Sequence, residues 1–151
     1  MDHALSLTRR AAAGAVAAAV AGLAAGQPLA AAQETPAAGA PADFRVVLHV
    51  ADADRWVYTL SNLENLTSEW PDARIRVVVD GSGVYPLQGR NDLTERLAAA
   101  QDKGVKLYVC PNALREHKID PISLAVDANT SLGGVVALVQ AQREGYGYVK
   151  P

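Results

Sequence analysis

Cys110 carries the most reactive side chain of this sequence and is its single cysteine. Pro111 follows it, and because proline is favoured at the first position of a helix, Cys110 is predicted to be a helix N-cap. The unpaired N–H groups and the dipole at a helix start favour a thiolate over a thiol. Cys110 is therefore a candidate nucleophile or sulfur acceptor, with the alternative that it is a small buried hydrophobic side chain.

Two more polar side chains, His49 and Asp80, stand at the ends of apolar segments. Ligands gather beyond the carboxyl ends of parallel strands, so both are expected at the same sheet edge as Cys110. His49 is a candidate for proton transfer or for orienting the thiolate, unless it only satisfies a backbone carbonyl. No metal site is expected, because the three residues lack the spacing of a zinc motif.

The segment 81–84, which follows Asp80, is a candidate ligand-binding turn. Backbone N–H groups around Gly81 and Gly83 could hold an anionic sulfur donor. The two glycines resemble the start of a dinucleotide fingerprint, but Pro86 stands where the third glycine belongs. No nicotinamide, flavin or other cofactor is therefore expected.

Asn62, Asn65 and Arg115 complete the set of candidate ligand-binding residues. The two asparagines lie three residues apart and share one face of a predicted helix. They either present amides to the crevice or form a polar, solvated stripe. Arg115 follows Cys110 in the same predicted helix and adds positive potential near the sulfur.

Alternating strands and helices must position these residues. Apolar β-forming runs predict strands at 44–50, 74–79, 105–109 and 146–149, with a brief strand at 129–131. Helical spacing of apolar residues predicts helices at about 56–70, 92–103, 111–117 and 135–144. This alternation implies an α/β domain whose sheet is parallel or mostly parallel and has helices on both faces.

The first 32 residues have the order of a signal peptide. Arg9 and Arg10 precede an uncharged run that ends in Ala30-Ala31-Ala32, the small-residue pattern that a signal peptidase cuts after. We expect cleavage before Gln33, after export by the Sec route or the twin-arginine route. This predicts a periplasmic or secreted protein. The alternative is that residues 1–32 stay attached as an uncleaved tail.

The remaining sequence predicts a flexible tether at 33–43, rich in Ala, Pro and Gly, and a single folded domain at 44–151. The formal net charge of the whole chain is −2, and the basic residues beyond Arg10 are scattered singly, so no nucleic-acid partner is expected. The apolar leader lacks the length and the large side chains of a membrane span, so no membrane association is expected after cleavage.

Five segments of this domain carry a resemblance to one known family. They are His49-Val50-Ala51-Asp52, Leu60-Ser61-Asn62 with Asn65, Val77 to Val84, Gly104 to Cys110 with Ala113-Leu114-Arg115, and Gln142 with Glu144 to Tyr148. Together they resemble the DsrE/DsrF-like family of sulfur-relay proteins, particularly its small exported branch. The resemblance implies a three-layer α/β/α fold with a five-stranded, mainly parallel sheet, and subunits that assemble into dimers, trimers or hexamers.

The resemblance also implies that Cys110 accepts a sulfane sulfur as a persulfide and transfers it. Donor and acceptor would be proteins or small sulfur compounds, and the chain would be a carrier or a sulfurtransferase-like enzyme that His49 assists. Two alternatives remain open. One is a non-catalytic oligomeric module that binds a small ligand or a partner protein, and the other is a thiol redox sensor.

Overall fold

The computed structural model describes residues 43–151. The predicted signal peptide, 1–32, and all of the predicted tether, 33–43, except its last residue lie outside the described residues. Within 43–151, no helix is both long enough and apolar enough to cross a membrane.

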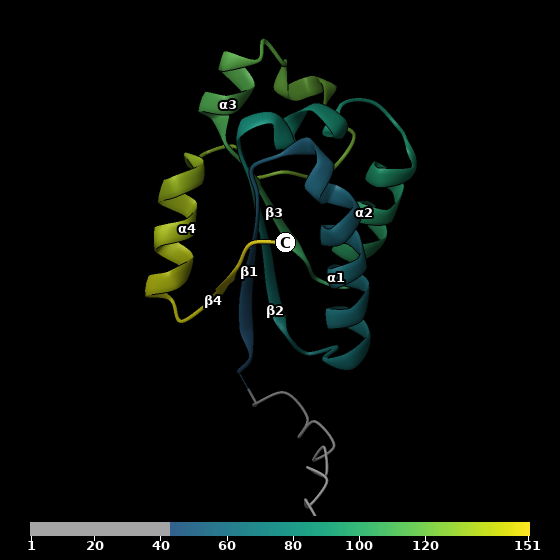
Figure 1. Cartoon of the computed structure of the whole chain (residues 1–151), viewed down its shortest axis with the longest axis vertical. Coiled ribbons are helices and arrows are strands. Elements are labelled where there is room, and N and C mark those ends of the chain that lie inside the picture. The colour runs from purple at the N-terminus through teal and green to yellow at the C-terminus, as the bar shows by residue number, and fades with distance from the viewer. Residues whose placement is uncertain (1–42) are drawn as a thin grey trace, which may run out of the picture. The chain divides into compact units, whose positions relative to one another are not determined.

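Four parallel strands form one sheet in the order β3-β2-β1-β4. The strands are β1 (Arg45–Val50), β2 (Arg74–Val79), β3 (Lys106–Val109) and β4 (Gly147–Val149). The helices are α1 (Trp56–Glu69), α2 (Asp92–Asp102), α3 (Pro111–Glu116) and α4 (Gly134–Arg143), with short 3-10 helices η1 (Ala53–Arg55), η2 (Gly81–Leu87) and η3 (Pro121–Ser123). Helices α1 and α2 cover one face of the sheet and α4 covers the other (Figure 1), so the predicted α/β/α layering is confirmed.

The sheet has four strands instead of the five expected, because the segment 129–131 does not become a strand. Asn129 forms a single parallel bridge with Tyr108 of β3. Its side-chain oxygen then accepts hydrogen bonds from the backbone N–H and the hydroxyl of Ser131, at 2.9 and 2.7 Å. This turn, typical of asparagine, takes the chain away from the sheet after one residue.

Two apolar clusters hold the layers together. On the α1 and α2 side, Val46, Leu48 and Val50 pack with Leu60 and other residues in the larger cluster. On the opposite side, a smaller cluster joins the sheet to α4; its buried members are Val47, Val78, Ala137, Leu138 and Ala141. Because both faces of the sheet are covered, the strands are apolar almost throughout rather than alternating.

The C-terminal end of α4 is fastened to the sheet by an ion pair. Arg76 Nη2 on β2 lies 2.5 Å from Glu144 Oε2, and Gln140 Nε2 donates to Glu144 Oε1 at 2.9 Å. The hydrogen bond from Arg76, and then the one from Gln140, lower the pKa of Glu144 below its ordinary value of 4.5. The carboxylate is therefore more stable in the folded chain than in the unfolded chain.

This pair predicts a pH dependence of stability. A carboxyl group whose folded pKa is lowered stabilises the fold fully above its unfolded value, near 4.5, and the stabilisation is lost as the pH falls through the lower folded value. Thermal unfolding at pH 6, 4.5 and 3 should therefore show a smaller acid-induced fall in melting temperature for Glu144→Gln than for wild type. Glu69→Gln, at an exposed position on α1, is the control and should follow wild type. An identical fall for Glu144→Gln and wild type would contradict the prediction.

Candidate functional site

One polar side chain from each strand region lies along the carboxyl edge of the sheet. In strand order these are Cys110 after β3, Asp80 after β2, His49 on β1 and Tyr148 on β4. The first three were expected at this edge from the sequence, on the condition that their strands are neighbours. The order β3-β2-β1 meets that condition and places Asp80 between the other two.

His49 is hydrogen-bonded on both sides. Its Nε2 lies 3.0 Å from Asp80 Oδ1, and its Nδ1 lies 2.8 Å from the hydroxyl oxygen of Tyr148. An ionised carboxylate can only accept hydrogen bonds, so the network assigns the Nε2 proton to His49. In the neutral ring, Nδ1 then accepts from the Tyr148 hydroxyl. The three groups form a chain that can hold a proton between an exposed phenol and a partly buried carboxylate.

Asp80 also packs against the first turn of α4. A Cβ built on Gly134 would lie 2.8 Å from Asp80 Oδ2 and 3.0 Å from Asp80 Cβ, so a side chain at this position would displace the carboxylate. The partial positive charge at the start of a helix favours a carboxylate beside it. Gly134 therefore allows α4 to approach closely enough to support Asp80 in the orientation that His49 uses.

Cys110 is the N-cap of α3, with Pro111 at the first helical position, and that prediction is confirmed. Its side chain makes no capping hydrogen bond to the helix, and the residue, which is 7% exposed, packs in the larger core cluster. Its backbone N–H donates to Val79 O at 2.9 Å, which holds the residue beside the end of β2. Two strand spacings, about 10 Å, separate the backbones of Cys110 and His49. Cys110 is thus a nearly buried residue whose backbone follows the strand next to that of Asp80, one strand further from His49.

The glycines of η2 allow it to approach the backbone at the end of β1, and one N–H group that was expected to bind a ligand is hydrogen-bonded within the fold. Gly81 has φ +47°, and a Cβ on it would lie 2.6 Å from Ala51 O; a Cβ on Gly83 would lie 2.6 Å from Val50 O. The backbone N–H of Gly83 donates to Ala51 O at 3.1 Å and to Asp80 O at 3.0 Å. The Gly83 N–H is therefore already engaged in tying η2 to the end of β1, and anion binding by the turn stays a prediction for its other N–H groups.

The structure does not bring the two asparagines to His49 and Asp80. Helices α1 and α4 cover opposite faces of the sheet (Figure 1). Asn62 and Asn65 lie on α1, whereas His49 and Asp80 lie on the α4 side. Arg115 lies on α3, and its guanidinium donates to the side-chain oxygen of Asn112. The Asn112 amide nitrogen in turn lies 3.7 Å from a Cβ built on Gly133, the N-cap of α4. Arg115 thus approaches the Asp80 side of the sheet edge, while Asn62 and Asn65 do not.

Tyr148 is the site residue that sequence analysis missed. It lies on β4, and β4 pairs in parallel with β1 so that Tyr148 stands directly beside Val47. Residues two apart on a strand share a face, so His49 lies on the same face as Val47 and Tyr148. The aromatic residues of the last strand were a signal for this contact, but the sequence does not say which strand lies beside β1.

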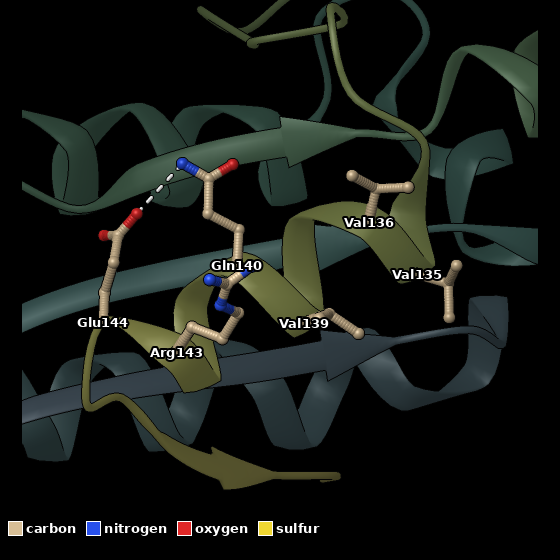
Figure 2. A pocket seen from close by; sticks show the side chains of 6 residues that line it. All are labelled: Val135, Val136, Val139, Gln140, Arg143 and Glu144. Atoms are coloured by element: carbon tan, nitrogen blue, oxygen red, sulfur yellow. Dashed lines mark hydrogen bonds between the residues drawn. The ribbon is translucent and has the colours of Figure 1, made fainter.

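A broad hollow of about 630 Å³ lies elsewhere, on the outward side of α4 (Figure 2). Val135, Val136 and Val139, each more than half exposed, line it together with Gln140, Arg143 and Glu144. It contains none of the candidate site residues. Among residues 43–151, no group of three or more His, Cys, Asp and Glu side chains is arranged to hold a metal ion.

Comparisons with known proteins bear on this arrangement. A family model described as the DsrE/DsrF-like family matches residues 27–151. The solved structure of MTH1491 from Methanobacterium thermoautotrophicum, described as a protein of unknown function, is 32% identical and has a TM-score of 0.63. Its alignment covers 72% of this chain and 100% of that one.

The structure of the ychN protein from E. coli covers the same shares, 72% and 100%, with a TM-score of 0.60. At 13% identity it supports the fold alone. No curated protein matches the chain. The family match over most of the chain and the full coverage of MTH1491 place this protein in the DsrE/DsrF-like family, whose members have sulfur-relay-like functions in general.

Proposed function

We propose that Cys110 carries sulfane sulfur as a persulfide, taking it from a donor and passing it to an acceptor. The position of Cys110 supports this proposal most strongly. It directly follows β3 at the carboxyl edge of the sheet, as the N-cap of α3 on the strand next to that of Asp80, and the residue is 7% exposed. Because the residue is nearly buried, a small sulfur donor would reach the thiol more easily than a bulky reagent would.

The transfer is an exchange between sulfur atoms and needs no metal or nucleotide. The Cys110 thiolate attacks the outer sulfur of a persulfide donor R–S–SH; a new S–S bond forms to Cys110, the old S–S bond breaks, and R–S⁻ leaves. In the second step an acceptor thiolate attacks the outer sulfur of the Cys110 persulfide and releases the Cys110 thiolate. No net oxidation occurs, because each step breaks one S–S bond and forms another.

The hydrogen-bonded chain of Tyr148, His49 and Asp80 would act as a positioning and proton-holding group. When Cys110 starts as a thiol, its proton must leave before attack and is returned to the departing R–S⁻. Neutral His49, held between Asp80 and Tyr148, can hold that proton at Nδ1 until R–S⁻ leaves. Asp80 lies between His49 and Cys110 in the strand order and would direct this exchange.

Intact-mass measurement tests the carrier proposal. The full chain, produced with secretion and kept reduced, is exposed to polysulfide beside Cys110→Ala and His49→Gln. We expect wild type to gain whole sulfur atoms that a reductant removes, Cys110→Ala to gain none, and His49→Gln to load more slowly. The same mass shows whether residues 1–32 are removed, as the proposed export to the periplasm or medium requires.

The opposite outcome separates the alternatives. If wild type gains no sulfur and Cys110 resists alkylation in the folded chain, the carrier proposal fails and a ligand- or partner-binding module leads. If Cys110 instead forms a mixed disulfide with a small thiol, or a disulfide with Cys110 of a second copy, the result favours a thiol redox sensor.

We also propose that a second copy of this chain covers the outward side of α4. Three exposed valines there form an apolar surface, and Arg143 and Glu144 at its rim give the surface both charges, which suits pairing with itself (Figure 2). We expect Val139→Glu to lower the mass measured by light scattering after size exclusion. Val57→Glu, at an exposed valine of α1, is the matched control and should leave the assembly unchanged. A wild-type monomer at micromolar concentration would contradict this assignment.

A further inference from the structure

Four basic side chains gather at the amino end of the sheet, on the face that α4 covers. The strand register places Arg45 beside Arg74, and Arg76 beside Lys106, as direct neighbours on paired strands. Residues two apart on a strand share a face, so Arg74 and Arg76 join the two pairs into one group. Like charges directly opposite each other destabilise a sheet, so this arrangement calls for compensating negative charge.

The described residues supply only part of that charge. Asp43 pairs with Arg45 and lies 3.6 Å from Arg74, and Glu144 pairs with Arg76. Lys106 has no salt-bridge partner among residues 43–151. Two carboxylates thus face four cations, and the group keeps an excess of positive charge.

A cavity of about 400 Å³ opens onto this group. Arg74, Arg76 and Lys106 line it with the rings of Tyr108 and Tyr146, and no carboxylate of the described residues does. The guanidinium carbon of Arg76 lies 4.2 Å from the centre of the Tyr146 ring and 5.5 Å from that of Tyr108, which fixes its orientation. Burial lowers the pKa of Arg76, but the hydrogen bond with Glu144 and the neighbouring phenols of Tyr146 and Tyr108 raise it by more. The pKa is therefore above its ordinary value, and the guanidinium stays charged.

We propose that this cavity binds a doubly charged tetrahedral oxyanion, either phosphate or a sulfur oxyanion, free or carried on a small molecule. Guanidinium groups present paired N–H donors that match the oxygens of such anions, and an ammonium group adds a point charge. An anion bound here neutralises the excess positive charge of Arg74 and Lys106. Lys106 and Cys110 lie at opposite ends of β3, about 13 Å of strand apart. The oxyanion site is thus separate from the sulfur site and does not depend on the proposed carrier function.

Calorimetric titration of the full chain at low ionic strength tests the site, with inorganic phosphate, sulfate and thiosulfate as separate probes. Arg74→Gln and Lys106→Gln are the variants, because both side chains are exposed and neither supports Glu144. We expect each to weaken binding roughly tenfold, as the loss of one charge-assisted hydrogen bond does. Lys118→Gln removes the same charge near the end of α3 and should bind like wild type. The probe that binds most tightly identifies whether the site prefers phosphate or a sulfur oxyanion.

Two results would overturn the proposal. One is the absence of saturable binding of all three probes to wild type at millimolar concentration. The other is equal weakening by Lys118→Gln and Lys106→Gln, which would mean general attraction by surface charge. Backbone amide shifts of wild type during the same titrations give a second test that needs no variant: they should move first at residues 73–76 and 104–108.

Discussion

Gly81→Ala is expected to destabilise the fold by about 3–5 kcal/mol, well beyond an ordinary glycine replacement. Gly81 has a positive φ of 47°, which L side chains avoid, and its new Cβ would lie 2.6 Å from Ala51 O, a backbone atom. Neither η2 nor the end of β1 can move aside easily, because Gly83 N–H bonds Ala51 O and Trp56 Nε1 donates to Gly83 O at 2.8 Å. The clash is therefore relieved only by displacing backbone.

Gly89→Ala separates the two causes. Gly89 also has a positive φ, of 65°, but a Cβ on it meets nothing within 4 Å. Its cost should be the left-handed backbone alone, about 1–2 kcal/mol. Urea unfolding of wild type and both variants at pH 7 measures the difference, with the slope of the free energy against urea checked for each. Equal losses for the two variants would show that the close approach of Gly81 to Ala51 O adds nothing to the cost of the left-handed backbone.

The elements that could be predicted from the sequence are those with strong local patterns. The apolar runs at Arg45–Val50 and Arg74–Val79 have the composition of strands covered on both faces, and the Cys110-Pro111 pair marks a helix start. Both depend on residues next to each other in the chain. The brief strand at 129–131 failed for a local reason as well, because the side chain of Asn129 satisfies a turn instead of leaving its backbone to the sheet.

The site needed information that local patterns lack. Which strands are neighbours decides that Asp80, rather than Cys110, contacts His49, and that Tyr148 lies on the other side of the ring. Helical spacing correctly puts Asn62 and Asn65 on one helix but does not say which face of the sheet that helix covers. The need for glycine at position 134 arises only from the approach of α4 to Asp80.

Gly134→Ala should separate Asp80 from His49 while leaving the fold intact. The new Cβ would lie 2.8 Å from Asp80 Oδ2 and 3.0 Å from Asp80 Cβ. Rotation of the carboxylate away from His49 relieves the first contact, and a shift of a few tenths of an ångström between α4 and Asp80 relieves the second. Alanine favours the helix by up to about 1 kcal/mol over glycine, which offsets part of the lost hydrogen bond. Overall stability is therefore a poor measure of this change, and the contact itself must be observed.

The His49 ring provides that observation. In wild type, the Nε2 proton is held against Asp80 at an N-to-O distance of 3.0 Å and should give a slowly exchanging, downfield NMR resonance. Gly134→Ala should lose that resonance, and so should Asp80→Asn, which removes the acceptor charge. Gly133→Ala is the matched control, because a Cβ there meets its nearest atom at an ordinary 3.7 Å.

Under the carrier proposal, loading of Cys110 with sulfur should slow at least tenfold in Gly134→Ala and stay near wild type in Gly133→Ala, since about 1.4 kcal/mol of lost support corresponds to a factor of ten. Loss of the resonance with unchanged loading would confine the hydrogen-bonded chain to a structural role and leave Cys110 to act without it.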